Sequence, residues 1–260
     1  MLFNINDGGL IQHIFSGSFE KAWYFYLTYI GFVLLVMLGS YLLGSINSSI
    51  IISKILYRDD IRKHGSGNAG MTNMLRTYGK GAAGLTLLGD MLKTALAILL
   101  SAILFGFNYA GGISTGDGLC YVAGLFAVIG HIFPIYYGFK GGKGVLATAT
   151  MALILTPLPF AILFLLFVII VWISKYVSLG SVTVAILYPV VLHGFFTVMF
   201  SEAQYSMPGL AAFSTIALAV IIVWCHRGNL QRISNRTERK ISFKKKPKAD
   251  GEDTDNAEKK

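Results

Sequence analysis

The sequence predicts an all-α membrane protein with seven transmembrane helices, an extracytoplasmic N-terminus and a cytoplasmic C-terminus. Of its 260 residues, 54% are apolar and 13% are charged, with a mean hydropathy of +0.62, whereas a soluble domain carries about a quarter charged residues. Several apolar runs approach or exceed the roughly 18 residues that indicate a membrane-spanning helix. The runs are continuous, so they lack the alternation of a transmembrane β-barrel. Basic residues gather in a few loops and the tail, as expected when charge sets membrane topology.

The chain divides into three parts. Residues 1–21 are a mixed polar and apolar lead, residues 22–240 form the seven-helix domain, and residues 241–260 form a charge-rich tail that we expect to be disordered. Polar residues interrupt the first span, and they must face protein or a cavity because lipid cannot satisfy them: Gly44, Ser45, Asn47, Ser48 and Ser49. The predicted spans are about 22–56, 81–107, 119–137, 145–156, 157–174, 182–200 and 208–224.

The count of seven depends on a hairpin at Thr156-Pro157-Leu158-Pro159. A single helix over residues 145–174 would leave six spans. With seven spans, the basic residues at 54–80, at 140–143, at 175 and from 227 onward all lie in the cytoplasm. This arrangement follows the positive-inside rule, whereas six spans destroy the bias. The charge distribution therefore favours the hairpin.

The longest polar interruption, residues 58–80, contains the pattern G-x-G-x-x-G at 65–70. A dinucleotide fingerprint would need a preceding strand in a βαβ unit, and here the preceding segment spans the membrane, so we reject that reading. The glycines still allow consecutive backbone N–H groups to bind an anion, and Arg62, Lys63 and Arg76 add positive charge. The alternative is a tight cytoplasmic turn that only sets topology.

A second polar loop has the sequence Lys140-Gly141-Gly142-Lys143-Gly144. It is not a Walker A loop, because Gly144 stands where Ser or Thr would hold magnesium, so no metal is implied. Two lysines with flanking glycines at the start of a helix nevertheless make a good anion site. His131 precedes this loop, and a lone histidine in an apolar span is more often structural than catalytic.

Three further clusters have both a functional and a structural interpretation. Ser178-Leu179-Gly180-Ser181, read alone, is an ordinary helix cap. His226-Arg227-Gly228-Asn229 begins a basic segment, and from Arg236 onward we favour a stop-transfer cluster. Asp90 and Lys93 predict a local ion pair with Lys93 snorkelling to the interface, and Asp90 is a secondary functional candidate.

Under the seven-span topology, the polar clusters all reach the cytoplasmic face. Topology alone does not require glycine, serine and asparagine there. The sequence therefore predicts a composite site for one or two phosphate groups beside the lipid, built from Ser45, Arg62, Asn68, Lys140, Lys143, Ser178, His226, Arg227 and Asn229.

Five motifs together resemble a known family over nearly all of residues 24–240. They are LLGSI (42–46), IRKHGSGNAGMTNMLRTYGK (61–80), GHIFPIYYGFKGGKGV (130–145), VSLGSV (177–182) and HRGNLQRI (226–233), the last followed by Glu238 and Lys240. The sequence is similar to the PlsY family, the bacterial membrane glycerol-3-phosphate acyltransferases that use acyl phosphate. Asn47 stands where that family usually has proline, and Leu146 adds a residue within its usual KGVAT. Neither departure affects a charged or glycine position.

The resemblance implies a reaction, its partners and a location. A fatty acyl group would pass from acyl phosphate to the 1-hydroxyl of sn-glycerol 3-phosphate, giving 1-acylglycerol 3-phosphate (lysophosphatidic acid) and phosphate, without a cofactor. We expect a multi-pass protein of the bacterial plasma membrane, surrounded by lipid, with a cytoplasmic active site and no nucleic-acid partner. The sequence leaves open whether the lead or the tail contacts the enzyme that makes acyl phosphate.

The resemblance also implies roles for individual residues. Lysine and arginine side chains would stabilise the phosphates, Ser45, Ser178 and Asn229 would orient substrate, and the general base would be His226 or the phosphate of glycerol 3-phosphate itself. The implied catalytic residues are Ser45, Lys143, His226 and Asn229. The implied substrate-binding residues are Arg62, Ser66, Gly67, Asn68, Thr72, Asn73, Lys140, Gly141, Gly142, Ser178, Ser181 and Arg227.

Two other functions would use the same charges. A transporter of phosphate esters would place them along a path through the membrane midplane, whereas these clusters are expected at one face. A non-catalytic scaffold that binds anionic lipid through its tail would leave the glycine loops and the polar face around Ser45 unexplained.

Overall fold

The computed structural model describes residues 10–11, 22–107, 109–110, 113–114, 118–199 and 207–241. Within these ranges the regular secondary structure is helical apart from one pair of two-residue antiparallel strands, β1 (Tyr109–Ala110) and β2 (Ile113–Ser114). The helices are α2 (Ala22–Ser45), α3 (Ser48–Tyr57), α4 (Met71–Tyr78), α5 (Lys80–Phe105), α6 (Leu119–Ile132), α7 (Val145–Leu155), α8 (Pro157–Ser174), α9 (Val177–Met199), α10 (Gly209–Cys225) and α11 (Arg227–Ser234), with 3-10 turns η2 (Ile61–Lys63) and η3 (Ile135–Tyr137).

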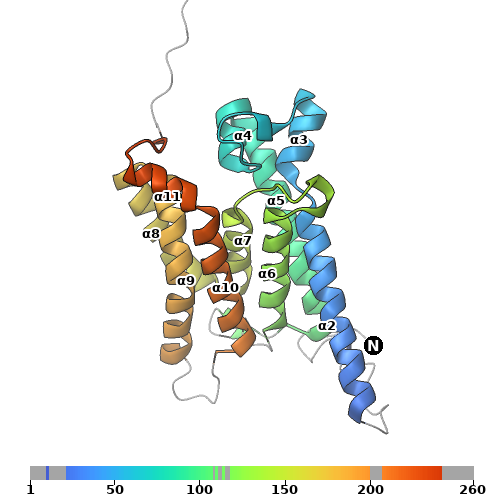
Figure 1. The fold of residues 1–260 in the computed structure, drawn as a ribbon. Helices are drawn as coiled ribbons and strands as arrows, with labels where there is room; N and C mark the ends of the chain where they lie inside the picture. Colours follow the sequence, from blue (N-terminus) through green and yellow to red (C-terminus); the bar gives the residue numbers. More distant parts are fainter. Residues whose placement is uncertain are drawn as a thin grey trace, which may run out of the picture.

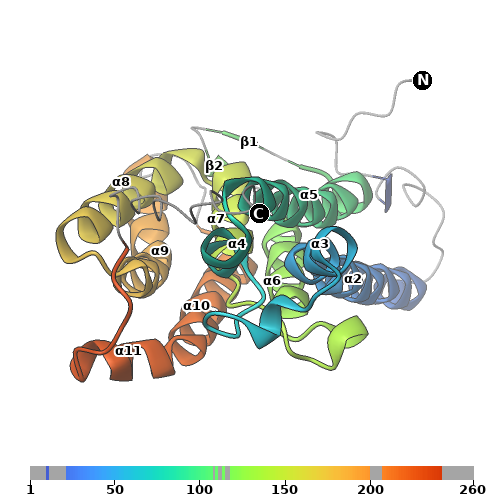
Figure 2. The same cartoon turned by 90° about the horizontal axis from the view of Figure 1, so that it is seen from above.

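The long helices form a bundle around α6 (Figure 1). Helix α6 packs against α2, α5, α7 and α10, while α8 and α9 pack together at one side of the bundle (Figure 2). Gly44 on α2 and Gly130 on α6 allow a close approach of these two helices, because a methyl group at either position would overlap a backbone oxygen of the other helix, that of Ala127 or of Tyr41. Small residues at such crossings let membrane helices pack closely. Close packing stabilises their association in lipid, where there is no hydrophobic driving force between helices.

Five helical segments among the described residues are long and apolar enough to cross a bilayer. They are Tyr26–Tyr57, Lys80–Phe105, Leu119–Tyr137, Pro157–Ser174 and Val177–Met199, and α10 with α11 makes a sixth if this pair, bent by 53°, is one span. The all-helical membrane fold is therefore confirmed. Helix α7 has 11 residues, about 16 Å, so it reaches only half-way through a hydrocarbon core of about 30 Å.

The predicted break at residues 156–159 is present. Helix α7 ends at Leu155 and α8 begins with Pro157 as its first residue. Proline suits this position because the first N–H of a helix has no intrahelical acceptor to lose. Helix α8 then packs against α7 and α9.

The first predicted span, by contrast, is two helices. The chain breaks at Ile46–Asn47, where the Asn47 side chain accepts a hydrogen bond from the backbone N–H of Ile50 (3.1 Å) and caps α3. Ser45, Asn47 and Ser49 are fully buried, as expected for polar groups at this depth. The cap explains why an apolar run that continues in the sequence does not continue as one helix.

Helix α9 begins at Val177, five residues before the predicted start at Val182. Ser178–Ser181 form its first turns instead of a cap outside it, and Ser181 Oγ donates to the backbone oxygen of Val177 (2.9 Å). A serine that bonds to the preceding turn in this way is compatible with a helix interior. This start brings Ser178 to the polar end of the bundle.

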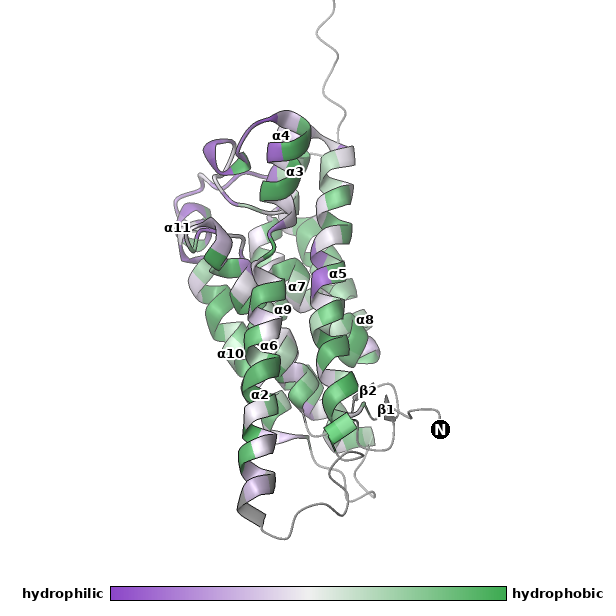
Figure 3. Ribbon diagram, turned by 90° about the vertical axis from the view of Figure 1, so that its right-hand side faces the viewer, coloured by the Kyte–Doolittle hydropathy of each residue, from purple (hydrophilic) through white to green (hydrophobic). Residues whose placement is uncertain are grey.

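Hydrophilic residues gather at the end of the bundle that carries α3, α4 and α11, and one hydrophilic turn lies within α5 (Figure 3). The predicted lead and tail lie outside the described residues except for Leu10, Ile11 and Ile241. The candidate site is at the polar end.

Candidate active site

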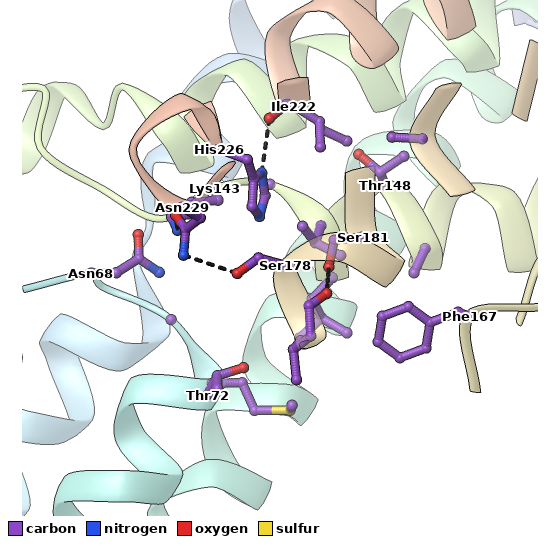
Figure 4. Close-up of a pocket in the computed structure, with 18 of the residues that line it drawn as sticks. Asn68, Thr72, Lys143, Thr148, Phe167, Ser178, Ser181, Ile222, His226 and Asn229 are labelled. Carbon is purple, nitrogen blue, oxygen red and sulfur yellow. Dashed lines mark hydrogen bonds between the residues drawn. The ribbon is translucent and has the colours of Figure 1, made fainter. Parts of the chain in front are cut away.

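A cavity of about 650 Å³ lies between the polar loops and helices α7, α8 and α9. Segments far apart in the sequence contribute to its walls, and several of their side chains point toward one another (Figure 4). The implied site residues that line it are Ser66, Asn68, Thr72, Asn73, Lys143, Ser178, Ser181, His226 and Asn229.

A hydrogen-bond network forms the polar end of this cavity. Lys143 Nζ donates to Asn229 Oδ1. Asn229 Nδ2 donates to Ser178 Oγ (2.9 Å) and to Glu238 Oε1 (2.6 Å), and Ser178 Oγ donates to the same carboxylate oxygen (2.7 Å). Arg232 Nε donates to Glu238 Oε2 (2.7 Å). The network fixes the orientation of the Asn229 amide and holds the Lys143 ammonium at the cavity wall.

This end of the cavity suits an anion. Partial burial lowers the pKa of Lys143, while the Glu238 carboxylate raises it. Partial burial opposes ionisation of Glu238, but hydrogen bonds from Asn229, Ser178 and Arg232 hold its pKa below the ordinary value. Ammonium and guanidinium groups donate charge-assisted hydrogen bonds that suit phosphate oxygens. The cations that line the cavity are Lys143, Arg76, Arg232 and Arg239.

His226 follows the last residue of α10 and is 3% exposed. Its Nδ1 lies 2.8 Å from the backbone oxygen of Ile222 (Figure 4). A carbonyl can only accept, so Nδ1 carries the hydrogen and Nε2 keeps a lone pair. Burial lowers the pKa of His226 to about 4 against the opposing hydrogen bond to Ile222, and the charge of Lys143 lowers it further. The ring is therefore neutral at pH 7 and able to accept a proton.

The other end of the cavity is apolar. Side chains of α7, α8 and α9 line it, including Ala149, Leu163, Phe164, Phe167, Val184 and Ala185. One cavity thus joins a cationic end to a hydrocarbon-like end, which fits an amphipathic ligand. Sequence reasoning missed this half, because its residues look the same as any lipid-facing residues of a span.

Seven implied site residues do not line this cavity: Ser45, Arg62, Gly67, Lys140, Gly141, Gly142 and Arg227. Ser45 is buried, its Oγ donates to the backbone oxygen of Tyr41 (2.8 Å), and the same Oγ accepts from the N–H of Ile135 (3.4 Å). Arg227 is exposed and lies over the Trp224 ring, 4.2 Å from its centroid. In this structure, therefore, Ser45 and Arg227 have structural contacts.

Arg62 joins the two polar loops. It forms an ion pair with Asp60 (2.7 Å) and donates to the backbone oxygens of Tyr137 (2.9 Å) and Lys140 (3.4 Å). Its hydrogen bonds, opposed by partial burial, lower the pKa of Asp60 to about 2. Lys140 itself is exposed, so only its main chain takes part. Asn73 has a related role in the first loop, because its amide bonds to the main chain at Ser66, Ile61 and His64.

Other residues at the cavity were missed or misread. The stop-transfer interpretation overlooked Glu238, which belongs to the polar network. The available signal was that Glu238 is the one carboxylate in the basic stretch 227–248. The predicted ion pair between Asp90 and Lys93 is confirmed at 2.8 Å. The predicted snorkelling of Lys93 to the membrane interface is wrong, because Lys93 is buried and its ammonium contacts His131. His131 in turn lines the cavity.

We expect Glu238→Gln to lower kcat/KM by about 10- to 100-fold. The glutamine side chain would face three donors, on Asn229, Ser178 and Arg232, with one acceptor oxygen, and at least one hydrogen bond of about 1.5–3 kcal/mol would be lost. Steady-state kinetics with the purified enzyme measures this loss. Arg236→Gln is the control, because Arg236 is exposed and outside the cavity. Equal activity of the two variants would contradict a role for the Glu238 carboxylate.

Comparisons with known proteins agree with this geometry. The family model for glycerol-3-phosphate acyltransferase matches residues 34–236. Glycerol-3-phosphate acyltransferases of Syntrophomonas wolfei and Halalkalibacterium halodurans are 44% and 43% identical, over 78% and 81% of this chain and 94% and 96% of theirs. The crystal structure of PlsY, an integral membrane glycerol 3-phosphate acyltransferase, in its glycerol 3-phosphate form has a TM-score of 0.66 at 31% identity, covering 81% of this chain and 96% of that one. The chain belongs to the glycerol-3-phosphate acyltransferase family.

Proposed function

We propose that this protein transfers a fatty acyl group from acyl phosphate to the 1-hydroxyl of sn-glycerol 3-phosphate, giving 1-acylglycerol 3-phosphate and inorganic phosphate for phospholipid synthesis. The observation that carries the proposal is the two-ended cavity, which offers cations to phosphate groups and an apolar wall to an acyl chain. Solved structures of PlsY in a glycerol 3-phosphate form and a lysophosphatidic acid form support it.

The reaction replaces the mixed anhydride bond of acyl phosphate with a carboxylic ester bond. The hydroxyl oxygen of glycerol 3-phosphate attacks the acyl carbonyl carbon, and the bond from that carbon to the phosphate oxygen breaks. Phosphate leaves with the electron pair, and the hydroxyl proton passes to a base. Lys143 and neighbouring guanidinium groups stabilise the charge that develops on oxygen, which is the largest catalytic contribution in many acyl transfers.

Two groups can take the proton. His226 is neutral, with its Nε2 lone pair free of the backbone contact that Nδ1 makes. The phosphate of glycerol 3-phosphate can also accept a proton at neutral pH. In both cases Asn229 and Ser178 would orient the substrate by hydrogen bonds. Their hydrogens are used within the polar network, but Asn229 Oδ1 and Ser178 Oγ each keep an acceptor lone pair for a substrate hydroxyl.

We place the acyl chain at the apolar end, between α7, α8 and α9. Ala185→Phe should narrow this end and lower kcat/KM for a 16-carbon acyl phosphate by about 10-fold, with a smaller loss for an 8-carbon donor. Ile186→Phe is the matched control, because Ile186 is the next residue on α9 and points away, 49% exposed. Equal losses for both donors would exclude chain binding beside Ala185.

The membrane arrangement is also a proposal. Seven membrane segments put the lead (1–21) outside, the tail (241–260) in the cytoplasm, and the cavity mouth on the cytoplasmic side of the plasma membrane. This count treats α7 and α8 as two segments, although the helical part of α7 covers only about half of the hydrocarbon core. Cation–π pairs support an interface at this end: Lys54 with Tyr137, Lys175 with Trp172 and Arg227 with Trp224. In a variant without native cysteines, Lys140→Cys in intact cells should resist a membrane-impermeant maleimide. Labelling of this cysteine would place the loop outside the cell and would contradict the proposed orientation.

The assay that tests the activity uses purified protein, palmitoyl phosphate and glycerol 3-phosphate. We expect phosphate and 1-acylglycerol 3-phosphate in equal amounts. Binding of glycerol 3-phosphate without either product would contradict the acyltransferase and favour a transporter. Uptake of glycerol 3-phosphate into vesicles that contain the protein would then test the transporter.

A further inference from the structure

Three ionisable side chains meet inside the apolar body, beside the cavity. Asp90 and Lys93 lie on α5 and His131 lies in the last turn of α6, and they are 1%, 4% and 4% exposed. Ionised groups at membrane depth are costly, so they are rare unless they are paired and have a role. The reaction described above gives them none.

The Lys93 ammonium has a full set of partners. It lies 2.8 Å from Asp90 Oδ1, 2.8 Å from the backbone oxygen of Ile46 and 3.0 Å from His131 Nδ1. An ammonium has three hydrogens and no acceptor, so these three contacts satisfy it. Ser48 Oγ donates to the same Asp90 oxygen (3.0 Å). The cluster thus ties the break between α2 and α3 to α5 and α6.

The contact with Lys93 also fixes the imidazole of His131. Because the ammonium can only donate, Nδ1 of His131 accepts and the ring hydrogen is on Nε2. The same contact restricts rotation of the ring, which presents its Nε2–Cε1 edge to Gly142.

The loop that carries Lys143 packs against this ring. The backbone N–H of Gly142 donates to the backbone oxygen of His131 (3.1 Å), and that of Gly141 donates to Ile132 (3.1 Å). A methyl group at Gly142 would overlap His131 Nε2 and would lie 2.8 Å from the backbone oxygen of Ala69. The position of Gly142, and hence of the next residue, Lys143, therefore depends on His131.

We propose that Asp90, Lys93 and His131 are positioning residues that set the Lys143 ammonium at the phosphate end of the cavity. Lys93 and Asp90 orient His131, His131 holds Gly141-Gly142, and this loop presents Lys143 to Asn229 and the substrate. The inference rests on the proposed acyltransferase function, because it assigns these residues to the same site.

The test uses a pair of substitutions that removes both charges. Lys93→Met alone would leave the Asp90 carboxylate buried without its partner, which is strongly destabilising. Asp90→Asn/Lys93→Met keeps both shapes and leaves no unpaired charge. Thr94→Val is the matched control: Thr94 is fully buried on the same helix, and its hydroxyl bonds only to the backbone oxygen of Asp90 (2.9 Å).

The first measurement is hydrogen exchange of the full-length protein, followed by mass spectrometry of peptides covering residues 138–146. We expect faster exchange at Gly141 and Gly142 in the double variant and unchanged exchange in Thr94→Val, with thermal unfolding of both near that of the wild type. We also expect kcat/KM to fall by about 10²-fold in the double variant, the loss that misplacement by about 1 Å can cause.

The second measurement separates positioning from general damage. If the cluster acts through Lys143, its removal in a Lys143→Ala background should cost less than about threefold, because the two changes then share one effect. Equal losses in both backgrounds, or unchanged exchange in the loop, would overturn the proposal. A wild-type protein that makes no product would instead contradict the acyltransferase, and the exchange data would still report on the cluster.

Discussion

Lys143→Ala is expected to lower kcat/KM for glycerol 3-phosphate and acyl phosphate by about 10²–10³-fold, the loss typical of removing one preorganised group that stabilises developing charge. Lys143 lines the cavity and donates to Asn229 Oδ1 within the network that also holds Ser178 and Glu238. No other side chain of the same loop reaches the cavity. Steady-state kinetics in detergent, with both products quantified, measures the loss.

Lys140→Ala is the matched control from the same loop. Lys140 carries the same charge three residues away, but its side chain is exposed and outside the cavity, and only its backbone oxygen bonds to Arg62. We expect its activity to stay within about threefold of the wild type, as for exposed charges generally. Equal losses in the two variants would mean that net charge matters and the geometry of Lys143 does not.

His226→Asn is expected to reduce kcat by about 10²-fold or more with little change in KM, if Nε2 of His226 is the general base. Asparagine can still donate to the backbone oxygen of Ile222, so the substitution removes Nε2 and keeps the contact that His226 Nδ1 makes at 2.8 Å. A near-normal kcat would instead assign the base to the phosphate of glycerol 3-phosphate.

The pH profile separates the same two bases. Because burial lowers the pKa of His226 to about 4, a His226 base stays unprotonated as pH falls, and activity declines only near pH 4. A phosphate base would protonate near its second pKa, about 6, and activity would decline there.

The stability of the fold also depends on the ionisation of His226. Between its ordinary pKa of about 6.5 and its folded-state pKa of about 4, the His226 side chain is protonated in the unfolded chain and neutral in the folded chain. Unfolding therefore becomes easier as pH falls in this window, and His226→Asn should weaken that dependence.

The sequence predicted the polar half of the site better than the apolar half, for a physical reason. In a chain dominated by apolar residues, Lys143, Ser178 and Asn229 are conspicuous because polar groups there need partners, and the structure does bring them together. The sequence could not tell that Arg62 points at the other loop and Lys140 at solvent, because charge alone carries no direction.

The apolar half was invisible for the opposite reason. Leu163 and Phe167 on α8 line the cavity, whereas Trp172 and Ile173 of the same helix are exposed at 67% and 71%, yet all four are ordinary residues of a span. The break at Asn47 was visible as a run of polar residues, but its effect, an N-cap that ends one helix and begins another, depends on a single side-chain hydrogen bond.

Under the proposed function, the half-length helix α7 determines the depth at which the acyl donor would bind. Since α7 extends about 16 Å, the apolar end of the cavity beside it would lie within one leaflet, at the depth of the neighbouring acyl chains. In the proposed reaction, a donor bound there would exchange with the membrane by lateral diffusion, while glycerol 3-phosphate would arrive from water at the polar end. Lifting a palmitoyl chain into water would cost about 0.8 kcal/mol for each CH₂ group, roughly 12 kcal/mol in total. A reaction centre at the boundary of the two phases would avoid that barrier, and the new lipid would stay in the leaflet from which the donor came.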